Sequence, residues 1–207
     1  YTNGIYGFMS ILFRLLEHEN PDGVAVAFDL KAPTFRHKMY ADYKAGRKGM
    51  PDELRSQMPL LKKLLTLMGY TCLELEGYEA DDILGTLAFA LEKSGGECVI
   101  ATGDRDALQL ISDNVKVLLS STKMGKPEII TFDKAALLEK YGLTPNQMIE
   151  LKALMGDTSD KIPGVSGVGE KTALKLICEY GSLDGLYEGY EASSLSAKMK
   201  EKTDFSI

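Results

Sequence analysis

Apolar residues recur along the chain at two spacings, one typical of helices and one typical of buried strands. Residues 5–16 place an apolar side chain every three or four positions, which predicts a helix that Thr2 or Asn3 caps and that ends in the Asn-Pro-Asp-Gly turn at 20–23. A continuous apolar run follows at 24–28, and such a run is typical of a strand covered on both faces. The same pattern predicts strands at 71–75, 98–101, 115–119 and 128–132.

Helical spacing returns between these strands. It predicts helices at 51–68, 79–94, 108–111 and 133–141, the last one capped by Asp133, and beyond Gly142 only helices, at 146–155, 170–179 and 182–187. Because strands alternate with helices in the first part, we expect an α/β domain over 1–142, with an open, mostly parallel sheet and helices on both faces. We expect a helical subdomain over 143–207, whose last 20 residues fray because they have little to bury.

One long stretch, 31–51, shows no apolar periodicity and is too long for an ordinary connection, which favours a functional loop or lid. The net charge is −6, yet nine lysines and arginines lie between Lys31 and Lys63 against three acidic residues. Such segregation suits a basic channel that leads to an acidic centre. A solvated loop is the simpler interpretation, but cations and aromatic rings alternate here as single-stranded nucleic acid requires: Arg36, Lys38, Tyr40, Tyr43, Lys44 and Arg47.

Carboxylates follow the predicted strands and open the predicted helices. Asp29 comes directly after the strand at 24–28, and Asp104 and Asp106 follow the strand at 98–101. Ligands bind beyond the carboxyl ends of strands in such sheets, so these acids are expected at one edge. Taken singly, each could be a helix-dipole partner or a turn residue. Two further clusters are expected to complete the set, Glu79, Asp81 and Asp82 at a helix start and Asp157 and Asp160 in the helical part.

This donor set favours a hard divalent cation. So many carboxylates repel one another unless cations neutralise them, and oxygen ligands without His or Cys select Mg²⁺ or Mn²⁺. Two such ions suit hydrolysis of a phosphodiester. The chain has two histidines and no CxxC pair, which argues against a zinc site.

A glycine-rich turn precedes the predicted helix at 170–179. Gly164, Gly167 and Gly169 leave backbone N–H groups open at a helix N-terminus, with Lys171 and Lys175 close behind. This arrangement is typical of a phosphate clamp, although a flexible loop before a core helix explains the glycine spacing equally well.

The length of the apolar runs and the number of cysteines exclude several protein classes. No apolar run approaches the ~20 residues of a membrane span. Three widely spaced cysteines indicate reduced core thiols and a cytosolic protein. The first residue is Tyr1 rather than Met, so we expect a fragment of a longer protein.

Four ordered segments resemble the bacterial 5′ nuclease family, which includes the 5′-to-3′ exonuclease domains of DNA polymerases and is related to flap endonucleases. They are AFDLKAPTFRHKMYADYKAGR at 27–47, GYEADDILGTLA at 77–88, TGDRDALQLI at 102–111 and GDTSDKIPGVSGVGEKTALKLI at 156–177. The resemblance implies hydrolysis of 5′ ends and 5′ flaps of DNA in replication and repair. It also implies a monomeric protein of the bacterial cytoplasm that acts beside DNA as a separate nuclease or as part of a polymerase.

The resemblance also implies roles for individual residues. It places Asp29, Glu79, Asp81 and Asp82 beside a first divalent ion, and Asp104, Asp106, Asp157 and Asp160 beside a second. It makes 31–59 similar to the helical arch through which a 5′ strand passes, and the turn at 164–169 similar to a helix-hairpin-helix element that holds duplex DNA, often around K⁺. The implied DNA contacts are Arg36, Tyr43, Lys44, Arg47, Gly164, Gly167, Gly169, Lys171, Thr172 and Lys175, with Lys44 and Arg47 orienting the strand for cleavage.

Two alternatives remain at this point. The family pattern begins with an apolar strand ending in Asp-Gly, so we expect the core of this chain to lack that strand and one metal ligand. A fragment of this kind could recognise branched DNA without cleaving it. A phosphatase that uses Asp29 as nucleophile explains less, because Lys31 stands where its second acid would be and the basic segment would have no role.

Overall fold

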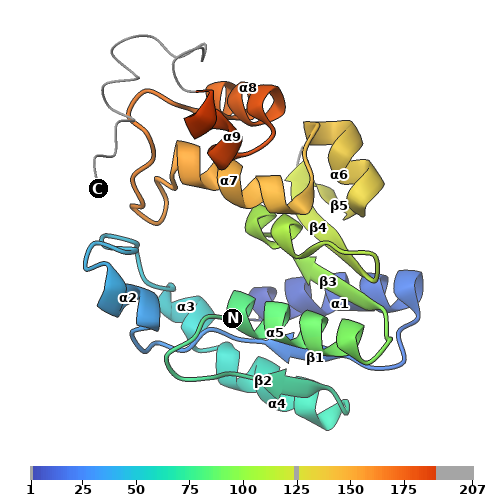
Figure 1. Cartoon of the computed structure of the whole chain (residues 1–207). Helices are drawn as coiled ribbons and strands as arrows, with labels where there is room; N and C mark the ends of the chain where they lie inside the picture. Colours follow the sequence, from blue (N-terminus) through green and yellow to red (C-terminus); the bar gives the residue numbers. More distant parts are fainter. Residues whose placement is uncertain (1, 124–125, 190–207) are drawn as a thin grey trace. The chain divides into compact units, whose positions relative to one another are not determined.

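The computed structural model describes residues 2–123 and 126–189 (Figure 1). The chain divides into two compact units. The first comprises residues 1–40 and 46–86, and the second comprises residues 41–45 and 87–207. The middle of the predicted turn at 123–126 and most of the predicted frayed tail lie outside the described residues.

The first unit packs helices against a two-stranded parallel sheet. β1 (Ala25–Ala27) pairs with β2 (Thr71–Leu73), with Val26 opposite Cys72. The helices are α1 (Asn3–Glu19), α2 (Phe35–Met39), α3 (Asp52–Arg55), α4 (Met58–Leu67) and the start of α5 (Ala80–Lys93). Buried apolar side chains from α1, α4 and the end of β1 form the core: Met9, Leu12, Phe28, Leu61 and Leu65.

Two local predictions for this unit are wrong. The helix expected over 51–68 is broken into α3 and α4 at Ser56–Gln57. Pro59 explains the break, because proline lacks an N–H and its ring would clash with a preceding helical carbonyl, so it is tolerated only in the first turn of a new helix. Thr2 stands at the N-cap of α1 without a side-chain capping bond, and the side chain of Gln57 takes that role.

The second unit holds the second sheet and most of the remaining helices. β3 (Cys98–Thr102) pairs in parallel with β4 (Val115–Lys123), and β4 pairs antiparallel with β5 (Lys126–Phe132). The short helix predicted at 108–111 is a 3₁₀-helix, η1 (Arg105–Leu110). After β5 the chain forms the helices α6 (Lys134–Tyr141), α7 (Pro145–Met155), α8 (Glu170–Tyr180) and α9 (Leu183–Glu188).

Helix ends in this unit follow the sequence signals closely. Asp133 accepts a hydrogen bond from the N–H of Ala136 at 2.8 Å, which confirms it as the cap of α6. Thr144 and Gln147 form a reciprocal capping box at the start of α7. Gly142 ends α6 with a φ of 69°, the left-handed conformation that glycine adopts without strain.

The fold class is confirmed, but the strands pair differently from the single sheet that we expected. Among the described residues, β1 pairs with β2 and β3 pairs with β4 and β5, in two separate sheets. The apolar pattern locates strands without identifying their neighbours, because it depends on burial and not on which edge supplies the hydrogen bonds. β1 is also less covered than its apolar run predicted, since Ala25 is exposed.

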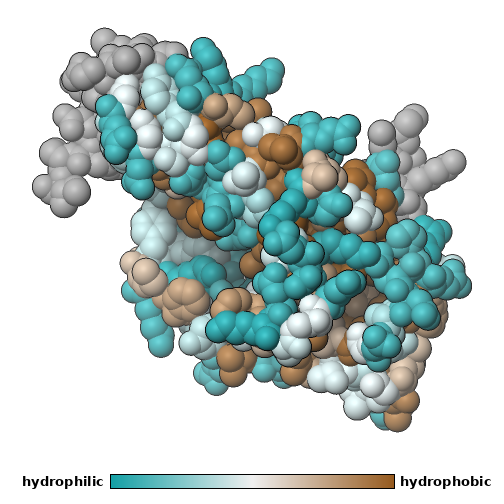
Figure 2. All heavy atoms as spheres, turned by 45° about the vertical axis from the view of Figure 1, so that its right-hand side comes forward, coloured by the Kyte–Doolittle hydropathy of each residue, from teal (hydrophilic) through white to brown (hydrophobic). Residues whose placement is uncertain are grey.

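Polar side chains dominate the face shown in Figure 2, with apolar side chains exposed among them. In the part of the chain that the structure describes, no helix has the length and apolar character needed to cross a membrane. All three cysteines are free thiols; Cys178 is exposed, so the prediction that it is a core residue is wrong.

Candidate functional site

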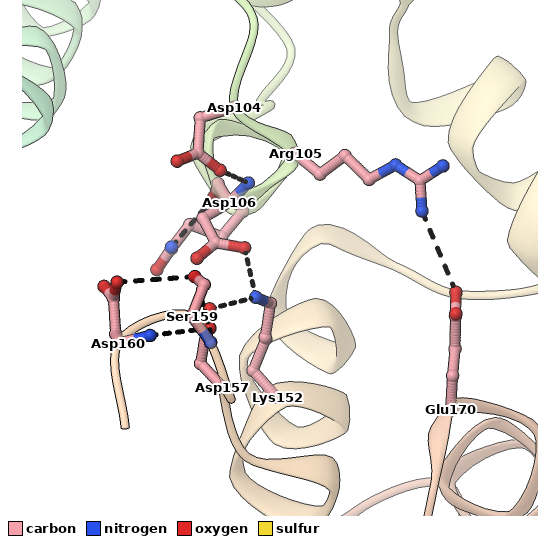
Figure 3. Close-up of polar contacts among 9 residues, drawn as sticks. Asp104, Arg105, Asp106, Lys152, Asp157, Ser159, Asp160 and Glu170 are labelled. Carbon is pink, nitrogen blue, oxygen red and sulfur yellow. Dashed lines mark hydrogen bonds and ion pairs between the residues drawn. The ribbon is translucent and has the colours of Figure 1, made fainter. Parts of the chain in front are cut away.

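Acidic side chains gather at the end of β3 in the second unit (Figure 3). The segment after β3 is shaped by its own side chains. The N–H of Asp104 donates to Thr102 Oγ1 at 3.1 Å, and the N–H of Asp106 donates to Asp104 Oδ1 at 2.9 Å. Asp104 is therefore the N-cap of η1, and this bond fixes the position of the Asp106 backbone at the start of that helix.

The second acidic segment is the loop after α7. Asp157 and Ile162 exchange two backbone hydrogen bonds of 2.8 Å, which close the loop. Inside it, Asp157 Oδ1 accepts from Ser159 N–H at 2.8 Å, from Ser159 Oγ at 2.7 Å and from Asp160 N–H at 3.1 Å. One oxygen of Asp157 is therefore used to order the loop, and the other faces outward from it.

Close backbone contact dictates the glycines around this loop. A Cβ on Gly156 would lie 2.3 Å from the backbone nitrogen of Gly164, and a Cβ on Gly164 would lie 2.2 Å from the carbonyl carbon of Met155. Neither position can accept a side chain, because the obstructing atoms are backbone. Gly164 thus has a packing reason to be glycine, and its contact with DNA remains a prediction.

Lys152 joins the two acidic segments, and our sequence analysis missed it. Its Nζ lies 2.8 Å from Asp106 Oδ1 and 2.9 Å from Asp157 Oδ2 (Figure 3). The contact with Asp106 brings together α7 and η1 from positions 46 apart in the sequence, and no local pattern marks a helical lysine for such a role. The structure thus brings Asp106 and Asp157 to one cation. Asp104 is hydrogen-bonded to Asp106 in the first segment, and Asp160 is hydrogen-bonded to Asp157 in the second.

These ionic contacts shift the pKa values of Lys152 and Asp157. Partial burial alone would lower the pKa of the Lys152 ammonium, but its hydrogen bonds to Asp106 and Asp157 outweigh burial and raise it. Partial burial would likewise raise the pKa of Asp157, but hydrogen bonds from Lys152, Ser159 and Asp160 hold it well below its usual range. Both groups are therefore charged at neutral pH.

The first unit holds the other acidic cluster. Asp29 follows β1, and its Oδ1 accepts from the N–H of Ala80 at 2.7 Å, at the start of α5. Asp82 Oδ2 accepts from the N–H of Glu79 at 2.9 Å. Asp81 lies exposed in the same first turn of α5. The four acids predicted beside the first ion thus lie in two segments joined by hydrogen bonds.

An arginine neutralises this cluster. Arg36 of α2 binds Asp82 with both guanidinium nitrogens, at 2.8 and 2.7 Å, and its Nη1 lies 3.8 Å from Glu79 Oε2. Arg36 was predicted to contact DNA; here its guanidinium fork matches the carboxylate geometry of Asp82 instead.

The donor set and its arrangement lead to different conclusions about a metal ion. Carboxylate oxygens without His or Cys suit Mg²⁺ or Mn²⁺. Within residues 2–123 and 126–189, however, no three acidic, His or Cys side chains converge closely enough to hold an ion. Arg36 and Lys152 occupy oxygens that an ion would need. The residues fit a divalent ion by their chemistry, and the described donor side chains would have to rearrange to converge on one.

Among the residues predicted to contact the DNA strand, Tyr43 and Lys44 have surroundings that the sequence did not predict. Tyr43 is buried, with 5% of its surface exposed. Lys44 adopts a left-handed backbone with a φ of 54°, and its N–H donates to the carbonyl of Asp160 at 2.9 Å. The segment 41–45 is thereby anchored to the acidic loop, while Arg47 is exposed.

The glycine turn leads into α8 as predicted. Gly169 is the N-cap of α8, and Gly167 has a φ of 88°. Lys171 and Lys175 are exposed and Thr172 is half-buried. The first N–H groups of a helix have no acceptor within the helix, so this end can bind an anion. Arg105 Nη1 lies 4.0 Å from Glu170 Oε1, which links the start of α8 to the Asp104–Asp106 segment (Figure 3).

Comparison with known families matches nearly the whole chain. A model described as the 5′-3′ exonuclease N-terminal resolvase-like domain matches residues 1–142, and one described as the 5′-3′ exonuclease C-terminal SAM fold matches residues 143–205. The chain belongs to the 5′-3′ exonuclease family. The resemblance seen in the four sequence segments is thereby confirmed.

Curated relatives of this 5′-3′ exonuclease chain are DNA polymerases I. It is 50% identical over 201 residues to DNA polymerase I of Streptococcus pneumoniae strain R6, which covers 97% of the chain and 23% of that protein. It is 46% identical over 204 residues to DNA polymerase I of Bacillus subtilis, covering 99% of the chain and 23% of that protein. The chain therefore spans about a quarter of the length of these relatives.

Solved structures of similar fold include an exonuclease and a catalytic core bound to DNA. The T5 5′-exonuclease with bound zinc matches with a TM-score of 0.75 at 22% identity, covering 96% of this chain and 74% of that one. The catalytic core of Rad2 in complex with DNA substrate matches with a TM-score of 0.58 at 21% identity, covering 97% and 61%. At such identity the matches establish the shared fold.

Proposed function

We propose that this chain hydrolyses phosphodiester bonds of DNA at 5′ ends and 5′ flaps with the help of two divalent ions, Mg²⁺ or Mn²⁺. Membership of the 5′-3′ exonuclease family carries the proposal. The two acidic clusters support it, because each presents hard oxygen ligands at the end of a strand or the start of a helix. When bound, such ions activate water and stabilise the leaving oxygen.

Individual side chains of this chain would bind the ions and orient the DNA strand. Asp29, Glu79, Asp81 and Asp82 would hold one ion, and Asp104, Asp106, Asp157 and Asp160 the other. Lys44 and Arg47 would orient the strand, with Lys44 held beside the acidic loop by its bond to Asp160. Arg36 and Tyr43 would contact DNA only where the substrate draws them from their present partners.

The helical part would hold the duplex. Gly164, Gly167 and Gly169 would let the backbone approach a phosphate, and Lys171, Thr172 and Lys175 would add contacts to neighbouring phosphates. A K⁺ ion at 164–169 would complete this clamp. We place a domain boundary near Gly142, so that 1–142 would carry six of the eight proposed metal ligands, while 143–207 would hold the duplex and add Asp157 and Asp160.

The relatives extend the proposal to the whole protein. Because they are DNA polymerases I, the nuclease would act in replication and repair in the cytoplasm, joined to a polymerase in a longer chain. A second candidate is recognition of branched DNA without cleavage. The internal pairing of the carboxylates favours it, because no three ligands converge in the described residues.

Cleavage of a 5′-labelled flap duplex tests the two candidates. We expect product with Mg²⁺ and none with EDTA, and a loss of at least about 100-fold in rate for Asp104→Asn, equivalent to ~2.7 kcal/mol of transition-state stabilisation. Asp113→Asn is the matched control, since Asp113 is an exposed acid of the same unit paired with Lys134. Tight flap binding without product, from the parent and both variants, would favour the recognition function.

A further inference from the structure

A lysine ammonium occupies the centre of the acidic cluster in the second unit. Lys152 Nζ lies within 2.9 Å of oxygens from two separate segments, Asp106 on η1 and Asp157 on the loop after α7 (Figure 3). These are two of the four acids proposed to hold one divalent ion. The side chain of Lys152 is about one third exposed, so water screens these ion pairs only in part.

The surrounding hydrogen bonds direct the carboxylates toward this ammonium. Oδ1 of Asp157 is bound by Ser159 and by the N–H of Asp160, which leaves Oδ2 for Lys152. The start of η1 is fixed by the bond from Asp106 N–H to Asp104. Gly156 ends α7 by donating its N–H to the carbonyl of Lys152 at 2.8 Å, and the chain then turns so that Asp157 lies beside the helix that carries Lys152.

A divalent ion held between Asp106 and Asp157 would compete with the ammonium for the oxygens that Lys152 now contacts. Mg²⁺ binds carboxylate oxygens at 2.0–2.1 Å, closer than any hydrogen bond. An ammonium group and a divalent ion that share the same two oxygens would repel each other strongly. Only one of the two cations can therefore occupy the position between Asp106 and Asp157.

We propose that Lys152 is a positioning residue that serves as an internal counter-cation: it holds Asp106 and Asp157 together in the metal-free protein and competes with the divalent ion for them. This inference rests on the proposed function, which assigns these two acids to an ion. It predicts that metal loading displaces the ammonium, and that part of the metal affinity is offset by the ion pairs that are lost.

An ordinary stabilising ion pair would behave differently. Lys134 and Asp113 form such a pair in the same unit, at 2.8 Å, with both side chains largely exposed. Removing Lys134 takes away one surface contact and leaves metal binding unchanged. Removing Lys152 takes away the competitor, so metal binding itself should respond.

Titration with Mn²⁺ by calorimetry, using the whole chain after removal of metal, tests the proposal. We expect Lys152→Met to bind Mn²⁺ about fivefold more tightly than the parent, because two partly screened ion pairs no longer oppose binding. Lys152→Arg keeps the charge and should stay near the parent. Lys134→Met is the matched control and should also bind as the parent does.

Thermal unfolding adds a second readout. In EDTA, Lys152→Met should unfold at a lower temperature than the parent, because Asp106 and Asp157 lose their shared cation, and Mn²⁺ should raise its midpoint more than it raises that of the parent. A folded Lys152→Met protein with unchanged or weaker Mn²⁺ affinity would overturn the counter-cation role alone. Absence of Mn²⁺ binding from the parent as well as the variants would overturn the divalent site, and the proposed function with it.

Discussion

Lys161 carries backbone strain in the acidic loop. Its φ of 57° lies in the left-handed region, which costs an ordinary L-residue about 1–2 kcal/mol and suits asparagine better. We expect Lys161→Asn to raise the free energy of unfolding by about 0.5 kcal/mol, because asparagine can adopt this conformation with a local hydrogen bond. Urea unfolding in EDTA measures the change.

The same substitution at a helical position separates strain from side-chain chemistry. Lys63 is exposed within α4, where asparagine has a lower helix propensity than lysine. Lys63→Asn should therefore lower the free energy of unfolding by about 0.4 kcal/mol. If Lys161→Asn also destabilises the protein, strain at this position does not limit its stability.

At the scale of single residues, the sequence identifies the acids better than the cations that neutralise them. Asp29 and Asp104 could be found because Asp29 comes directly after a strand-like apolar run and Asp104 stands three positions after the end of another. Lys152 could not, because its contact with Asp106 depends on how α7 packs against η1. The same holds for the pairing of Arg36 with Asp82, two residues 46 positions apart.

At the scale of elements, one glutamine joins α1 to the junction of α3 and α4. Gln57 is buried, and its Oε1 accepts from the N–H groups of Gly4 at 2.9 Å and Ile5 at 3.2 Å. Its Nε2 donates to the carbonyl of Glu53 at 2.8 Å and to Asn3 Oδ1 at 3.2 Å. The first turn of α1 is thus capped from more than 50 positions away.

Replacing Gln57 by leucine should cost about 2–3 kcal/mol of unfolding free energy, because the N–H groups of Gly4 and Ile5 lose their acceptor in a partly buried place. The amide protons of Gly4 and Ile5 should exchange faster in Gln57→Leu, which hydrogen exchange by NMR measures. Gln57→Glu keeps the acceptor and should lose less stability.

Gln109→Leu is the control for this change. Gln109 is exposed and makes one bond, from Nε2 to the carbonyl of Asp106 at 2.9 Å, so its loss should cost less than about 0.5 kcal/mol. Unchanged exchange at Gly4 and Ile5 in Gln57→Leu would show that α1 does not depend on this cap.

The elements themselves were largely predictable, and so were those ends that local capping residues set, but the pairing of the strands was not. Strong local signals placed the ends of α6 and α7, since Asp133, Gly142 and Thr144 act within a few residues of themselves. The capping of α1 by Gln57 and the pairing of strands into two sheets depend on contacts distant in sequence. Periodicity carries no information about such partners.

At the scale of the whole molecule, DNA binding has to overcome an unfavourable total charge. The net charge of −6 repels a polyanion, so affinity must come from local basic surfaces. The exposed Lys171 and Lys175 at the start of α8 form one such surface. If each neutralises a phosphate, Lys171→Ala/Lys175→Ala should flatten the slope of log affinity against log salt by up to about 1.8, at 0.9 per contact.

Fluorescence anisotropy with a labelled flap duplex in EDTA, where no cleavage is expected, measures this slope. The matched control is Lys134→Ala/Lys140→Ala, which removes the same charge from exposed positions of α6. Because both double variants change the net charge equally, a general electrostatic effect would alter both slopes alike. A slope that changes only for the α8 variant would locate the contact at the glycine turn, and equal slopes for all three proteins would remove α8 from the DNA-binding surface.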